Sequence, residues 1–83
     1  MKDYRIKFDE NYEEVGSLLE QLGYKNDKEW NEDQLRLRKG ALEYILALGG
    51  DLMDYGYYSH EGYGEYTDIT IEELRELVKQ QKP

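Results

Sequence analysis

One stretch of the chain, DYGYYSHEGYGEYTD at residues 54–68, holds most of the side chains that could do chemistry. It contains five tyrosines, three glycines and four acidic residues, and it has no lysine or arginine. Carboxylates pair with guanidinium and ammonium groups, and the faces of aromatic rings attract the same cations. Tyrosine also offers a large, rigid contact area, which is why protein interfaces are rich in it. This composition predicts a surface that binds something cationic.

Residues suited to catalysis are sparse. His60 is the only histidine, and a single histidine in a loop of glycines and tyrosines is usually just solvated. The chain has no cysteine, no G-x-x-x-x-G-K-[ST] phosphate loop and no dinucleotide fingerprint. Paired carboxylates can act as acid and base, but nineteen acids in 83 residues produce such pairs by chance. The acidic segments also lack the ordered spacing of a calcium site. We therefore expect no catalytic residues, no metal and no cofactor.

Charge is distributed unevenly along the chain. Nineteen acids and eleven bases give a net charge of −8. Residues 40–74 contain eight of the acids and no lysine or arginine, so the rest of the chain, with eleven acids and eleven bases, is balanced. Because this segment would repel phosphate and attract basic surfaces, we expect no direct nucleic-acid binding and a basic protein as partner. The simpler alternative is that the acids only keep a small protein soluble.

Length and hydropathy predict one cytoplasmic domain. The 83 residues are expected to fold as a single domain, residues 1–83. The longest apolar run, residues 44–48, is far shorter than the roughly 20 residues that span a bilayer. The N-terminal sequence MKDYRIKFDE has no hydrophobic signal region. We therefore expect a cytoplasmic protein without membrane contact.

Alternating apolar residues predict a sheet. The expected strands are residues 4–8, 35–38, 42–48 and 52–57. A helix over residues 33–48 is the alternative, but its apolar positions would spread over more than half of the helical wheel. Residues 25–33, KNDKEWNED, are expected to form a polar loop. Its Trp30 would cover the edge of the core or, alternatively, serve as a binding hot spot.

The first helix is predicted between the strand at 4–8 and the polar loop. Its apolar stripe consists of Val15, Leu18, Leu19 and Leu22. Asn11 and Glu14 match a capping box at its start, and Gly23 fits the left-handed position that ends a helix. Gly16 costs a helix about 1 kcal/mol relative to alanine. We therefore expect Gly16 to allow a close approach between this helix and the sheet.

The C-terminal helix has the clearest start signal, a T-x-x-E capping box formed by Thr70 and Glu73. The element order is then β-α-β-β-β-α, which predicts the α+β class: an antiparallel sheet with two helices on one face. Tyr55 and Tyr57 are expected to face the helices, while Tyr58 points away from them. The alternative for all the tyrosines is that they fill a small core in a chain with a single phenylalanine.

The chain resembles small, uncharacterised proteins that are common in bacteriophage and prophage genomes. The matching pieces are YRIKF at 4–8, QLGY at 21–24, Trp30 and ITIEEL at 69–74. The resemblance implies a phage-type origin. Phages encode many small acidic inhibitors of host defence, including anti-CRISPR and anti-restriction proteins that imitate the charge of DNA. Because the first half of this chain is balanced in charge, we expect a local acidic patch in place of full-length DNA mimicry.

These observations lead to a hypothesis of a non-enzymatic, phage-type inhibitor. It would bind a basic host protein that handles nucleic acid, with CRISPR effectors as the expected target class, through an acidic, tyrosine-rich surface. The residues expected at this surface are Asp54, Tyr58, Glu61, Tyr63, Glu65, Tyr66 and Asp68. One alternative is a binding sponge for a signalling nucleotide, with phosphate held by the basic cluster Arg36, Arg38 and Lys39. Another is a structural or regulatory domain that forms a homodimer through its tyrosines.

Overall fold

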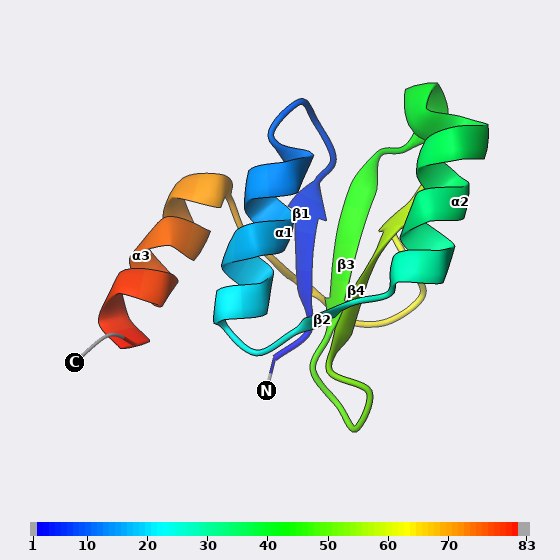
Figure 1. Cartoon of the computed structure of the whole chain (residues 1–83). Coiled ribbons are helices and arrows are strands. Elements are labelled where there is room, and N and C mark those ends of the chain that lie inside the picture. The colour runs from blue at the N-terminus through cyan, green and yellow to red at the C-terminus, as the bar shows by residue number, and fades with distance from the viewer. Residues whose placement is uncertain (1, 82–83) are drawn as a thin grey trace.

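The computed structural model describes residues 2–81, which form three α-helices and a five-stranded sheet (Figure 1). In chain order the elements are β1 (Tyr4–Lys7), α1 (Tyr12–Gln21), β2 (Lys25–Asn26), α2 (Lys28–Arg38), the 3-10 helix η1 (Lys39–Ala41), β3 (Tyr44–Leu48), β4 (Asp54–Tyr58), β5 (Thr67–Asp68) and α3 (Ile71–Gln81). The α+β class predicted from the sequence is confirmed.

The sheet is mixed, so the prediction of an antiparallel sheet is wrong at its edges. The strand order is β2-β4-β3-β1-β5. The three longer strands, β1, β3 and β4, pair antiparallel as expected, whereas β2 pairs parallel with β4 and β5 pairs parallel with β1. The edge strands have two residues each. Two residues are too few to produce an alternating pattern, and the alternation analysis therefore could not detect them.

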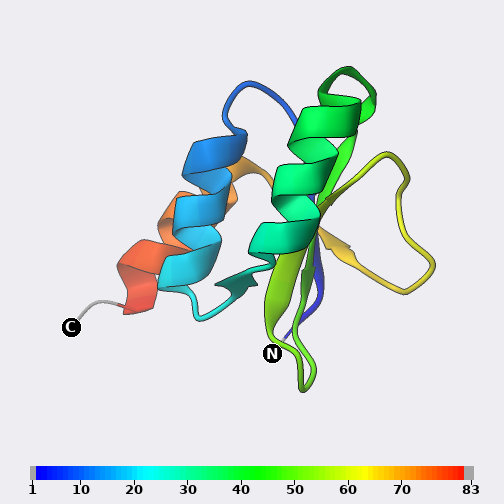
Figure 2. The same ribbon diagram turned by 45° about the vertical axis from the view of Figure 1, so that its right-hand side comes forward.

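One face of the sheet, here called the inner face, packs against α1 and α3. The pairing register places Ile6, Ile45 and Tyr57 side by side, with Ala47 and Tyr55 in the next row. These residues join apolar residues of both helices in one core. Tyr55 and Tyr57 are 2% and 5% exposed, which confirms that they face the helices. Helix α2 stands apart from this layer, alongside β4 (Figure 2).

The core is built partly from tyrosine, because the phenol rings fill space while their hydroxyls reach partners near the surface. The Tyr55 hydroxyl donates to Glu20 at 3.0 Å, and the Tyr24 hydroxyl donates to the carbonyl of Lys2. Burial raises the pKa of Tyr24 and of Tyr57 to about 12. Within residues 2–81, every buried side-chain nitrogen or oxygen has a hydrogen-bond partner. The structural explanation for the tyrosines is therefore correct for these three residues.

Helix α1 ends as predicted but begins differently. Gly23 has φ +108°, and the Tyr24 amide donates back to the Leu19 carbonyl at 3.0 Å, as in a Schellman motif. Asn11 occupies the N-cap position without a side-chain cap bond, so the predicted capping box is wrong. Glu14 instead accepts two hydrogen bonds from Arg75 of α3, at 2.7 and 2.8 Å. This bidentate pair joins the two helices.

Helix α3 begins at the predicted capping box. The Glu73 amide donates to the Thr70 hydroxyl at 3.1 Å, and the Thr70 amide donates to the Glu73 carboxylate at 3.1 Å. Leu74 is fully buried and Val78 nearly so, and both belong to the common core. The local signal was sufficient here because both partners of the cap lie within four residues.

Helix α2 replaces the predicted polar loop at 25–33 and the predicted strand at 35–38. Its sequence, KEWNEDQLRLR, has no β-branched residue and consists mostly of good helix formers. The Asp27 side chain caps its first turn. Leu35 and Leu37 alternate over too short a distance to define a strand, and Leu37 is 65% exposed. The only buried residue of α2 is polar, Asn31.

Asn31 anchors α2 by completing the hydrogen bonds of the β4 edge. Its amide nitrogen donates to the Tyr55 carbonyl at 3.2 Å, and its oxygen accepts from the Tyr57 amide at 2.9 Å. Trp30 adds a bond from its ring nitrogen to the Tyr57 carbonyl, at 2.9 Å. β2 pairs with the first two residues of β4, and these side chains bind the backbone of β4 beyond them. They cover backbone groups that would otherwise be an open strand edge.

We expect Asn31→Ala to lower the free energy of unfolding by about 1–3 kcal/mol, because it leaves buried groups of β4 without partners. Urea denaturation followed by circular dichroism measures the change. Asn11→Ala is the matched control, and it should change stability by less than about 0.5 kcal/mol, since the Asn11 side chain makes no cap bond. Equal losses in the two variants would contradict this account of α2.

Gly16→Ala tests the predicted close approach of α1 to the sheet. An added Cβ would lie 2.8 Å from the hydroxyl oxygen of the buried Tyr55 ring. We expect the overpacking cost of about 1–3 kcal/mol to exceed the helix-propensity gain of about 1 kcal/mol, so that the variant is less stable. In the control Gly40→Ala, the added Cβ meets nothing within 4 Å. A stabilised Gly16→Ala protein would show that this contact is not tight.

Candidate interaction surface

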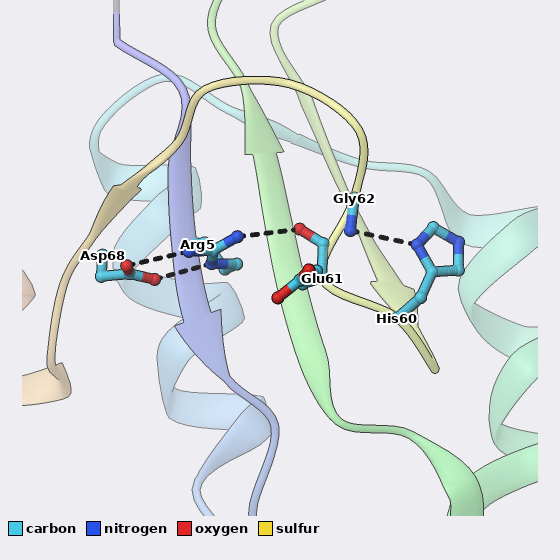
Figure 3. Close-up of polar contacts among 5 residues, drawn as sticks. All are labelled: Arg5, His60, Glu61, Gly62 and Asp68. Carbon is cyan, nitrogen blue, oxygen red and sulfur yellow. Dashed lines mark hydrogen bonds and ion pairs between the residues drawn. The ribbon is translucent and has the colours of Figure 1, made fainter.

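The tyrosine loop, residues 59–66, lies on the face of the sheet opposite α1 and α3, here called the outer face. The loop leaves the end of β4, crosses the outer side of β3 and returns to β5 beside β1 (Figure 3). In the view of Figure 2 it extends away from the helices. The outer face beneath it carries Arg5, Leu46 and Tyr58, which belong to three neighbouring strands. Tyr58 therefore points away from α1 and α3, the helices that cover the inner face, as predicted.

Arg5 of β1 binds Glu61 in the first half of the tyrosine loop and Asp68 just after the loop. Its guanidinium donates to the two oxygens of Asp68, at 2.6 and 2.9 Å, and to the Glu61 carbonyl at 3.1 Å (Figure 3). The same group lies 5.7 Å from the centre of the Tyr44 ring and 5.9 Å from that of Tyr66. The ion pair raises the pKa of Arg5 and lowers the pKa of Asp68. Arg5 is thus the positioning residue of the loop.

Gly62 fixes the path of the loop over the sheet. It has φ +85°, a conformation that favours glycine. An added Cβ would lie 2.7 Å from the Tyr66 ring and 2.9 Å from the Leu46 side chain. The Gly62 amide also donates to the ring nitrogen Nδ1 of His60 at 3.1 Å (Figure 3). The backbone therefore passes close to both Leu46 and the Tyr66 ring, where a side chain at position 62 would not fit.

Four aromatic rings form a continuous row from α2 to the tyrosine loop. The ring centres of Trp30 and Tyr58 are 5.2 Å apart, and the distances from Tyr58 to His60 and from His60 to Tyr63 are 5.3 Å each. Exposure is partial for Trp30, at 39%, and nearly complete for Tyr63, at 97%. We call these four residues the ring row. Trp30 binds the edge of β4 through its ring nitrogen and starts this row; it does not belong to the hydrophobic core or to the residues packed against it.

Between the loop and the sheet lies a groove of about 330 Å³, which we call the aromatic groove. Its lining residues are Leu46, Leu48, Tyr58, His60, Gly62, Tyr63, Gly64 and Tyr66. All three surface tyrosines predicted from the sequence therefore line one groove. The leucines come from the outer face of β3 and the remaining residues from β4 and the loop. The lining carries no carboxylate and no cation of its own.

Three of the four predicted acidic residues, Asp54, Glu61 and Glu65, neighbour lining residues of this groove in the chain or in the sheet register. Glu61 and Glu65 are exposed and each stands between two lining residues in the chain. Asp54 pairs in register with Leu48. Burial raises the pKa of the Tyr58 phenol most. The negative charges of Asp54 and Asp27 raise it further, so both carboxylates lie close to this phenol. Asp68 is instead bound to Arg5, so its charge is offset and its role is to hold the loop.

The sequence did not identify three residues of this surface, Arg5, Asp27 and His60, and it gave Trp30 only as an alternative binding hot spot. Arg5 and Asp68 are 63 residues apart, and Trp30 and Tyr58 belong to elements that only the fold brings together. The available signal was the alternation in residues 4–8, which places Arg5 on the face away from the helices. His60 had been expected to be simply solvated. It contributes a ring to the row and a hydrogen-bond acceptor to the loop.

Two residues of the basic cluster of the nucleotide alternative, Arg36 and Lys39, have partners away from the groove. Arg36 pairs with Asp33 at 2.9 Å, and the Lys39 ammonium lies 5.2 Å from the centre of the Tyr12 ring, on the inner side of the molecule. The guanidinium that contacts a groove residue is that of Arg5, and its donors already serve Asp68 and Glu61. The geometry therefore gives phosphate no cation at the aromatic groove.

We expect Arg5→Lys to loosen the junction between β5 and β1, because an ammonium group cannot reproduce the three directed bonds of the guanidinium. The amides of Thr67 and Ile69, which donate to the carbonyls of Asp3 and Arg5, should exchange with deuterium several-fold faster. The control Arg75→Lys weakens the pair with Glu14 across the molecule and should leave these two amides unchanged. Unchanged exchange in Arg5→Lys would show that the ion pair does not hold the junction.

The same junction should depend on pH in a defined direction. The folded pKa of Asp68 lies below its unfolded value of about 3.9, so the pair contributes fully above that value and is lost as pH falls through the lower folded pKa. Protection of Thr67 and Ile69, corrected for intrinsic exchange, should therefore fall only below about pH 4. In Asp68→Asn, the protection of these two amides should already be lower above pH 4, and it should not fall further as the pH is lowered through the Asp68 pKa.

Residues 2–81 contain no group of side chains suited to hold a metal ion, and no helix among them has the length and apolarity needed to cross a membrane. Comparison of the chain with protein-family models, with curated proteins and with solved structures found no match. The distinctive features of the candidate surface are the partly exposed ring row and the aromatic groove, which has acidic neighbours in the chain.

Proposed function

We propose that the chain is a non-enzymatic inhibitor of phage type, which acts in the host cytoplasm by binding a basic protein that handles nucleic acid, such as a CRISPR effector. The observation that carries the proposal is the aromatic groove with its acidic neighbours. In the chain or in the sheet register, Glu61, Glu65 and Asp54 neighbour residues of a groove lined by tyrosines and leucines. Rings and carboxylates together suit the arginines and lysines of a nucleic-acid-binding surface.

The exposed rings support binding over a purely structural role. Tyr24, Tyr55 and Tyr57 are needed in the core and account for part of the tyrosine content. Tyr63 is 97% exposed and contacts only the ring of His60 among the aromatic residues, so the core gains little from it. Large exposed side chains grouped on one face mark interaction sites more often than chance exposure does. A role in solubility alone would call for acids but not for these rings.

The charge distribution favours a cationic partner. The segment that builds β3, β4 and the tyrosine loop has no lysine or arginine between residues 40 and 74, whereas acids and bases balance in the rest of the chain. A cationic partner would therefore be attracted to this segment, and attraction of this kind raises association rates and falls with salt. This supports imitation of DNA charge by a local patch. The phosphate of a nucleotide would be repelled here, which makes the sponge alternative less favourable.

Reversing charge around the groove tests the proposal. The double variant Glu61→Lys/Glu65→Lys and wild type are immobilised, and basic proteins captured from a bacterial lysate are identified by mass spectrometry, with and without competing duplex DNA. We expect wild type to capture nucleic-acid-binding proteins that DNA displaces, and the variant to retain at most about a tenth of them.

The matched control is Glu10→Lys/Glu76→Lys, which changes net charge equally at two exposed positions away from the groove. It should retain most of the capture. Equal loss in both variants would mean that only overall charge matters, and full capture by Glu61→Lys/Glu65→Lys would overturn the assignment of this surface.

A further inference from the structure

We infer that the aromatic groove receives a single arginine side chain of the partner and prefers it to lysine. This inference rests on the proposed function of the same surface and adds the residue type that the surface recognises. It follows from three properties of the groove: its size, the nature of its lining, and the way the protein already holds an arginine of its own beside it.

The size and lining of the groove suit one long side chain. The volume of about 330 Å³ lies at the lower end of the range for small-molecule sites, roughly 300–1,000 Å³, so the groove is too small for a large cofactor. Leu46 and Leu48 offer apolar surface for the methylene groups of an arginine, as such stems pack on apolar surface while the charged end reaches out. Tyr58, Tyr63 and Tyr66 offer ring faces for the planar end.

Arg5 shows how one ring of the groove lining, Tyr66, accepts a guanidinium. It lies near the Tyr66 ring, 5.9 Å from its centre, while its nitrogens bind the Asp68 carboxylate in a bidentate pair. Tyr66 also lines the aromatic groove, where the exposed Glu65 precedes it in the chain. A guanidinium in the groove would thus meet a ring of the kind that Arg5 already contacts, in a part of the chain that has carboxylates and no lysine or arginine.

The preference for arginine follows from hydration and shape. An ammonium group is compact and strongly hydrated, so its transfer onto an apolar, aromatic lining is unfavourable, whereas a guanidinium is planar, weakly hydrated and stacks on rings. A neutral side chain of the same shape would pack on the lining but gain nothing from Glu61, Glu65 and Asp54. The groove therefore requires both the planar shape and the positive charge.

The test is a titration of the ¹⁵N-labelled full chain with three capped peptides, Gly-Arg-Gly, Gly-Lys-Gly and Gly-citrulline-Gly, followed by amide chemical shifts. The arginine peptide should shift the amides of Gly62, Gly64 and Leu48 saturably. Its dissociation constant should be at least threefold lower than that of the lysine peptide, and citrulline, which keeps the shape without the charge, should bind more weakly still. Tyr63→Ala should weaken arginine binding, and Leu52→Ala, at a 68% exposed position outside the groove, should not.

The outcomes separate this inference from the proposed function. Equal affinities for the arginine and lysine peptides, shifts scattered over acidic residues away from the groove, or no binding of the arginine peptide would overturn the inference. In each case hexa-arginine and hexa-lysine peptides, tested at low salt, examine the proposed function independently. If the hexapeptides bind and Glu61→Lys/Glu65→Lys abolishes that binding, the acidic, cation-binding surface stands without an arginine site. If neither hexapeptide binds, the proposed function fails as well.

Discussion

Side chains on a β-strand alternate between the two faces of the sheet, and β4 applies this constraint to a run of aromatic residues. Tyr55 and Tyr57 lie on the inner face and complete the core, while Gly56 and Tyr58 lie on the outer face. Gly56 leaves room for Trp30, whose ring carbon would lie 3.1 Å from an added Cβ. One strand thus supplies both the centre of the fold and Tyr58 of the ring row. A change of register by a single residue would exchange the two sets and destroy both.

The parts of the fold that were predictable from sequence are those whose signals are local. Helix α3 follows from a capping box whose partners lie three residues apart, and the end of α1 follows from Gly23. Helix α2 was missed because its anchor, Asn31, binds backbone groups of β4 that are 24 and 26 residues away. The N-cap position of α1 at Asn11 was correct, but the capping box was wrong for a related reason, since Glu14 pairs with Arg75 instead of the helix terminus. Such non-local bonds leave no periodic trace in a sequence.

For the candidate surface, too, some features were predictable from the sequence and others were not. Composition identified Tyr58, Tyr63 and Tyr66 because they are concentrated in one segment, and the structure places all three around one groove. All three carboxylates are exposed, and composition could not separate Asp68, which pairs with Arg5, from Glu61 and Glu65. Counting charges treats the three carboxylates alike. Only the strand pairing that brings residues 5 and 68 together makes one of them structural.

The position of Arg5 also has a consequence for how the molecule is made. Its partner Asp68 lies 63 residues later, and closing so long a segment carries a large entropic cost before any contact offsets it. While the chain emerges from the ribosome, the tyrosines of β4 and the loop are synthesised before β5 exists to fasten them. The outer face would therefore mature last, after the central strands have paired. A nascent or truncated chain that stops before residue 68 has the rings but lacks the fastening that arranges them.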